Sequence, residues 1–119
     1  MKLRLMLWLL GMLLKRARRR HADFRERLRD RGPLAWGIAT EDLTIARHYR
    51  LSADRVQSAS GLPVDLDLEL RFRDPDAALA VLRHPSPRTF RDGLIDGRLR
   101  LVGDTRDLER LQGLLAFLR

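Results

Sequence analysis

The sequence of 119 residues contains no cysteine. This absence excludes disulfide bonds, zinc sites built on thiolates and enzymes that use a cysteine nucleophile. The chain also lacks an apolar run of the roughly 20 residues that a helix needs to cross a bilayer. Its longest apolar run, 5–14, has about half that length, which is enough to enter one leaflet or to lie in the membrane interface.

Acidic residues are scarce at the beginning of the chain. Residues 1–31 contain 11 Lys or Arg and 3 Asp or Glu, whereas residues 32–119 contain 13 of each, so the first segment carries the entire net charge of +8. Clustered cations favour nucleic acid or an anionic membrane surface as partner. Because the remainder is electroneutral, we favour the membrane. We predict two parts: a membrane-associating helix at 1–31 and one domain with a single core at 32–119.

The first segment resembles a secretory signal in its apolar run, but five Lys or Arg within 15–20 follow at once and resist translocation. We therefore expect a cytoplasmic protein that is peripheral on the inner membrane. The helix would contact anionic lipids through its apolar and basic side chains. The predicted membrane contacts are Leu7, Trp8, Leu10, Leu14, Lys15, Arg16, Arg18, Arg19 and Arg20.

An apolar stripe with steps of four and three residues runs through this segment and ends near Gly32 and Pro33, which predicts one long helix. Its members are Leu3, Leu7, Leu10, Leu14, Ala17, His21, Phe24 and Leu28. Two alternatives to membrane association remain open. The stripe packs on the remainder of the chain or on a second copy, or, less favoured, the basic helix binds nucleic acid.

The remainder of the chain shows strand and helix patterns in alternation. Apolar residues at every second position predict strands at 34–40, 43–51, 56–60, 64–73 and 98–102. Helical spacing and turn residues predict helices at 76–83 and 89–95, and a last helix after Asp104. The order predicts an α+β fold in which helices cover one side of an antiparallel sheet of about five strands.

The sequence contains no pattern typical of catalysis. His21, His48 and His84 fall in different elements and lack the spacing of metal ligands. Acidic residues alternate along one strand at 65–69, as a solvated strand face requires, and Asp74 and Asp104 are placed to cap helices. We therefore predict no enzyme activity, no metal and no cofactor.

Much of the chain resembles the sterol carrier protein type 2 (SCP-2) family. The resemblance rests on the alternating strand VDLDLEL at 64–70, the helix start DPDAALAVL at 74–82, the segment TFRDGLIDGRLRLVGD at 89–104 and the helix LERLQGLL at 108–115, and the hairpin at 36–56 is similar to the early strands of the family. It implies an apolar tunnel for lipids between a five-stranded sheet and the helices. By position, the residues that would line the tunnel are Phe90, Leu94, Leu101, Leu111, Leu115 and Leu118.

Relatives of this fold also occur among bacterial accessory factors for ubiquinone biosynthesis, which handle polyprenylated quinone intermediates without performing chemistry. The resemblance thus predicts a non-catalytic lipid-binding protein at a membrane surface, with a quinone, isoprenoid or acyl lipid as ligand. The alternative is an interaction module with a filled core that recruits another protein, or a second copy, to the membrane. Nucleic acid is not an expected partner.

Overall fold

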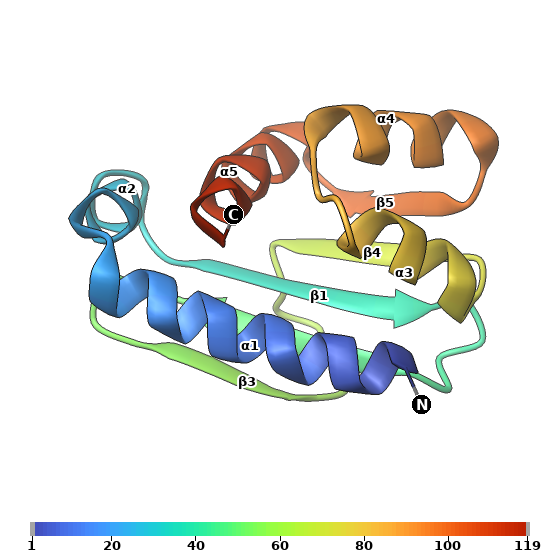
Figure 1. Cartoon of the computed structure of the whole chain (residues 1–119), viewed down its shortest axis with the longest axis horizontal. Coiled ribbons are helices and arrows are strands. Elements are labelled where there is room, and N and C mark those ends of the chain that lie inside the picture. Colours follow the sequence, from blue (N-terminus) through green and yellow to red (C-terminus); the bar gives the residue numbers. More distant parts are fainter. Residues whose placement is uncertain (1, 119) are drawn as a thin grey trace.

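The computed structural model describes residues 2–118, and within them five strands form one sheet. Figure 1 shows the long first helix running beside β3, while α4 lies beside β5 at the other edge of the sheet. In chain order the elements are α1 (Lys2–Arg20), α2 (Ala22–Arg31), β1 (Leu34–Thr40), β2 (Ala46–Leu51), β3 (Val56–Ser60), β4 (Leu68–Phe72), α3 (Pro75–Leu82), α4 (Pro87–Asp96), β5 (Leu99–Gly103), α5 (Thr105–Leu115) and the short 3-10 helix η1 (Ala116–Leu118).

The sheet has the order β3-β2-β1-β4-β5, and one of its pairings differs from the prediction. β1 pairs antiparallel with β2 but parallel with β4, so the sheet is mixed and mostly antiparallel. The hairpin β2–β3 occupies one edge of β1, and the chain must therefore return to the other edge before β4 begins. A parallel pair requires this kind of crossover connection.

The crossover at 61–67 passes over the face of the sheet opposite to the helices. Gly37 in β1 makes room for it, because a Cβ atom there would collide with Leu62 and meet Leu66. Asp67 fixes the end of the crossover: its carboxylate accepts a hydrogen bond from the Ala35 amide at 2.9 Å, and its own amide donates to the Ala35 carbonyl at 2.8 Å. The predicted strand at 64–73 is therefore shorter, and Val64 is fully exposed.

The turn between β1 and β2 is longer than predicted, because β2 begins at Ala46 whereas the predicted strand was 43–51. Asp42 holds this turn. Its carboxylate accepts hydrogen bonds from the Thr40 hydroxyl at 2.7 Å and from the amide and hydroxyl of Thr44 at 3.1 and 2.9 Å. Such side-chain bonds to nearby backbone compete with a strand ladder.

The predicted helix caps are confirmed. Asp74 accepts a hydrogen bond from the Ala77 amide at the start of α3, and Asp104 accepts one from the Arg106 amide at the start of α5. α4 begins with a reciprocal pair in which Ser86 and Thr89 each bond the other's backbone amide. These side chains satisfy amides that the first helical turn leaves unpaired.

The helix α1 belongs to the same hydrophobic core as the sheet. Its inward stripe, defined as Leu3, Leu7, Leu10, Leu14 and Ala17, is buried together with the inner face of the sheet. The burial of a leucine is worth roughly 1.5–3 kcal/mol, so this packing makes α1 part of the fold. The structure thus corrects three predicted membrane contacts: Leu7, Leu10 and Leu14 pack on the rest of the chain, which is the alternative left open above.

The beginning of the chain forms two helices, α1 and α2, where the sequence predicted one, and the break lies at a single residue. His21 has extended backbone angles, with φ −114° and ψ 106°, and separates α1 from α2. Arg25 bridges the break, since its Nη1 donates to the carbonyl of Arg18 at 2.5 Å and to that of Arg19 at 3.2 Å. The change of direction lets Phe24 reach the core, where it is fully buried.

Candidate functional site

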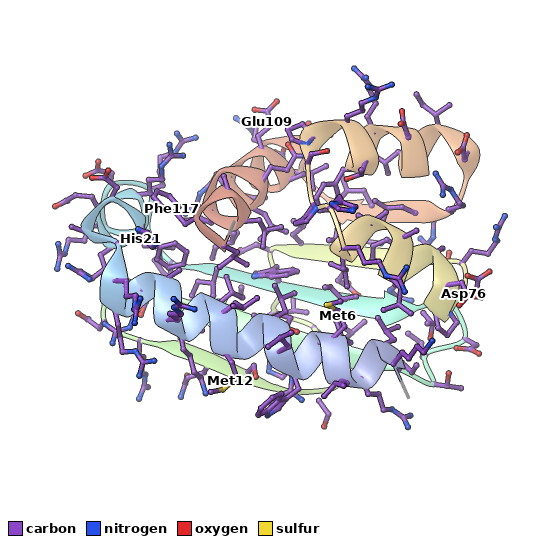
Figure 2. The ribbon with its side chains drawn as sticks, in the orientation of Figure 1. Met6, Met12, His21, Asp76, Glu109 and Phe117 are labelled. Carbon is purple, nitrogen blue, oxygen red and sulfur yellow. The ribbon has the colours of Figure 1, made fainter. Side chains whose placement is uncertain are left out.

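An unpartnered apolar surface lies on the side of α1 that faces away from the sheet. Leu5, Trp8, Leu9 and Met12 keep 65%, 53%, 42% and 43% of their surface exposed. At about 100° per residue, their mean direction lies about 170° from that of the inward stripe. Figure 2 shows the contrast for two methionines, as Met6 points into the core and Met12 lies on the other side of the helix. We name these four residues the outward stripe.

Exposed cations continue the outward stripe along the same helix. Lys15, Arg16 and Arg19 follow Met12 by three, four and seven residues and are exposed, as is Arg20. Within residues 2–118, none of these four forms an ion pair with a carboxylate. We name them the basic cluster.

Arg18, which was predicted with the basic cluster, differs from it. It is half-buried, and its Nη1 donates to the carbonyl of Ala53 at 3.4 Å. It therefore ties the end of α1 to the loop between β2 and β3 instead of extending freely from the surface.

Trp8 was among the predicted membrane contacts and is exposed, whereas Leu5, Leu9 and Met12 were not among them. The available signal was a second apolar spacing of three and four residues at positions 5, 8, 9 and 12. No helix within residues 2–118 has the length and apolar character needed to cross a bilayer.

The residues predicted to line a tunnel are spread over several environments. Phe90, Leu111 and Leu115 are fully buried in the common core, and Leu101 packs at its edge. Leu94 is 36% exposed. It lies in an open groove of about 530 Å³ between α4 and α5, where Leu108 is a neighbour and Arg88 and Arg91 contribute charge.

Leu118 lines a second opening, of about 370 Å³, between the end of α1 and η1. Figure 2 shows His21 and Phe117 side by side at this place, with ring centroids 5.4 Å apart. Leu13 and Ala17 add apolar surface, and Arg16 and Arg20 of the basic cluster stand at its rim. We name it the α1–η1 hollow.

The buried interior contains few polar side-chain atoms. Trp36 in the central strand is fully buried and stacks on Tyr49 with ring centroids 4.7 Å apart. Burial raises the pKa of the Tyr49 hydroxyl, which stays protonated and donates to the carbonyl of Leu7. Among residues 2–118, the indole Nε1 of Trp36 finds no acceptor. A buried donor without a partner costs about 1–3 kcal/mol.

The acidic side chains of the opposite face of the sheet and its loops are engaged in pairs. Asp65 lies 3.0 Å from Arg50, and Glu41 lies 2.9 Å from Arg100. The hydrogen bonds from these arginines lower the pKa of both carboxyl groups. Glu69 is likewise 3.0 Å from Arg71. A general acid needs a raised pKa, so Asp65 and Glu41 are suited to ion pairs that hold the sheet and its loops together and not to that role.

Histidines and carboxylates are not gathered into a metal site. Within residues 2–118, no three His, Asp or Glu side chains are grouped so that they could hold a metal ion. His48 is engaged with the backbone, since its Nδ1 lies 2.9 Å from the Gly61 carbonyl oxygen.

No protein family model matches the sequence, and no curated protein is detectably similar to it. Solved structures do match. A structure described as the ubiquinone synthesis protein UbiJ-SCP2 aligns with a TM-score of 0.70 and 13% identity, over 92% of this chain and 87% of that chain. Sterol carrier protein 2 from Yarrowia lipolytica, in its apo form, aligns with a TM-score of 0.59 and 11% identity, over 92% of this chain and 88% of that chain.

A third similar structure is a stereoselective inverting sec-alkylsulfatase from Pseudomonas sp., with a TM-score of 0.52 and 19% identity. Its match covers 69% of this chain but only 13% of that enzyme. The fold of this chain therefore occurs both as a nearly complete protein and as a small part of a much larger enzyme.

Proposed function

The chain has the SCP-2 fold, and we propose that it is a non-catalytic lipid-binding protein that holds an apolar ligand at a membrane surface. The observation that carries this proposal is the structural likeness over nearly the whole length to a ubiquinone synthesis protein and a sterol carrier protein. The ligand class we propose is a quinone, an isoprenoid or an acyl lipid. We place the protein on the cytoplasmic side of the inner membrane.

The ligand would enter through the α1–η1 hollow. Phe117 and Leu118 of η1 are only partly buried and line this opening. Leu111 and Leu115 of the preceding helix α5 belong to the apolar core. Burial of a ligand there is favourable by about 25 cal/mol per Å² of apolar surface.

Two separate polar features, one at the opening and one in the interior, would each favour a ligand that carries an oxygen atom. Arg16 and Arg20 at the rim of the hollow favour an anionic or strongly polar head group. In the interior, the unpartnered indole N–H of Trp36 favours a ligand that carries a carbonyl oxygen. A quinone and an acyl lipid both offer such an acceptor.

A displacement titration tests the proposal. Cis-parinaric acid, a fluorescent fatty acid, should bind the full chain, and a long-chain quinone should compete with it. Leu118→Glu places a charge at the hollow and should weaken binding, whereas the matched substitution Ile95→Glu, at a residue 75% exposed on α4, should not. Failure of the wild-type chain to bind the probe, or equal weakening by both substitutions, would contradict the proposal.

One observation favours a second candidate, an interaction module with a filled core. Phe90, Leu111 and Leu115 are each no more than 1% exposed, which is the packing expected when no ligand is accommodated. Under this alternative the parinaric acid titration gives no binding, while the protein retains a stable fold and still reaches the membrane.

A further inference from the structure

We propose that the outward stripe and the basic cluster together form a docking face that lays α1 flat on an anionic bilayer. The inference rests on the proposed function, and it names the surface and the partner that bring the lipid-binding domain to the membrane. It assigns membrane contact to Leu5, Trp8, Leu9 and Met12 instead of the inward stripe.

The geometry allows this contact without any change of fold. The outward stripe and the inward stripe lie on opposite sides of one helix, so the first can enter the interface while the second stays in the core. Docking through Leu7, Leu10 and Leu14 would instead require α1 to leave the sheet and expose the core beneath it. An amphipathic helix that lies in the interface plane typically buries its apolar face just below the headgroups.

The distribution of charge selects an anionic bilayer over a second copy of the chain. Cations stand at both ends of the outward stripe: Lys2 and Arg4 before it, and the basic cluster after it. Two copies that met through this face would bring cations together in either a parallel or an antiparallel arrangement. Anionic headgroups, in contrast, lie on all sides of a helix in the interface and attract every nearby Lys or Arg.

The docking face also places the α1–η1 hollow next to the membrane. Arg16 belongs both to the basic cluster and to the rim of the hollow. When α1 lies on the bilayer, the mouth of the hollow therefore borders the headgroup layer. An apolar ligand could then pass between membrane and protein without crossing water.

Vesicle co-sedimentation of the full chain tests the docking face. We expect binding to phosphatidylcholine vesicles that contain about one third phosphatidylglycerol, and much weaker binding to phosphatidylcholine alone. The triple variant Leu5→Gln/Trp8→Gln/Leu9→Gln and the triple variant Lys15→Gln/Arg16→Gln/Arg19→Gln should each bind at least about tenfold more weakly.

Matched controls remove similar groups elsewhere on the surface. Val64→Gln/Ile95→Gln and Arg55→Gln/Arg83→Gln/Arg88→Gln change exposed residues outside α1 and should bind within about twofold of wild type. The inference is overturned if wild type does not bind the anionic vesicles, or if the α1 variants bind as well as their controls. Formation of a dimer or of a protein complex that requires the outward stripe, without vesicle binding, also overturns it.

The same variants separate this inference from the proposed function. Because the outward stripe lies outside the core, the variant Leu5→Gln/Trp8→Gln/Leu9→Gln should still bind cis-parinaric acid. Vesicle binding without probe binding would contradict the lipid-binding function and leave the docking face intact. Probe binding without vesicle binding would contradict the docking face and leave the lipid-binding function intact.

Discussion

The hydroxyl of Tyr49 donates a hydrogen bond to the backbone carbonyl of Leu7 at 2.5 Å, across 42 residues of sequence. The bond joins the first half of α1 to β2 inside the core, where both residues are at most 1% exposed. It fixes which side of α1 faces the sheet, and thereby which side faces outward. The orientation of the proposed docking face depends on this contact and on the apolar packing around it.

Removal of this hydrogen bond should loosen α1. Tyr49→Phe deletes the hydroxyl and keeps the ring that stacks on Trp36, so we expect a loss of about 0.5–1.5 kcal/mol in the free energy of unfolding by urea. Amide hydrogen exchange should accelerate around Leu7 more than in β1. Unchanged exchange in α1 would show that the bond does not hold the helix.

The two stripes of α1 should respond differently to truncation. Leu14 is fully buried, and Leu14→Ala should lower the free energy of unfolding by about 2–5 kcal/mol. Leu9 is 42% exposed, and Leu9→Ala should change the free energy of unfolding by no more than about 1 kcal/mol. Thermal or urea unfolding of both variants measures the contrast. Equal losses of stability would mean that α1 does not pack on the sheet through Leu14.

The crossover between β3 and β4 should depend on the absence of a side chain at Gly37. Gly37→Ala places a methyl group against Leu62 and Leu66, and we expect it to lower the free energy of unfolding by about 1–3 kcal/mol. Leu62→Ala should make room for the methyl group. In a double-mutant cycle, the variant with both substitutions should therefore lose less free energy of unfolding than the sum of the losses of the two single variants. Strict additivity of the losses would contradict the contact between Gly37 and Leu62.

The turn before β2 should become less stable in acid. Hydrogen bonds, of which that from the Thr40 hydroxyl is the strongest, hold the pKa of the Asp42 carboxyl below its ordinary value. The folded pKa is thus lower than the unfolded one. The stabilisation is complete above the unfolded pKa of about 4 and is lost as the pH falls through the folded pKa.

The melting temperature between about pH 2 and pH 7 measures this effect. Wild type should lose more stability than Asp42→Asn as the pH falls below about 4, because the variant has no carboxyl group to protonate. Parallel curves for the two proteins would show that Asp42 does not contribute.

The sequence predicted the local elements well where a short pattern determines them. Asp74 and Asp104 act as caps because a carboxylate before a helix satisfies free amides in almost any context. The resemblance to the SCP-2 family rested on such local patterns, and the structural comparison confirms the fold. The parallel pairing of β4 with β1 was missed because it depends on a long-range crossover over Gly37, which has no local signature.

The partner of the apolar stripe of α1 was assigned wrongly for a different reason. Periodicity identified the buried side of the helix, but near its beginning the helix is apolar on the other sides too, so the pattern alone cannot decide which side meets the sheet and which meets a membrane. Tertiary contacts decide this: Leu7 and Leu14 pack on the sheet, and Leu5 and Leu9 remain outside. Association with a membrane stays a prediction, in which Leu5, Leu9 and Met12 replace Leu7, Leu10 and Leu14 beside Trp8 and the basic cluster.

Native mass spectrometry of the full chain purified without detergent shows whether the protein holds an apolar ligand. We expect a mass above that of the chain, and an organic solvent should extract the additional component as an apolar compound with at least one carbonyl or anionic oxygen. A mass equal to that of the chain alone, unchanged after incubation with a long-chain quinone or a fatty acid, would contradict the proposed lipid-binding function.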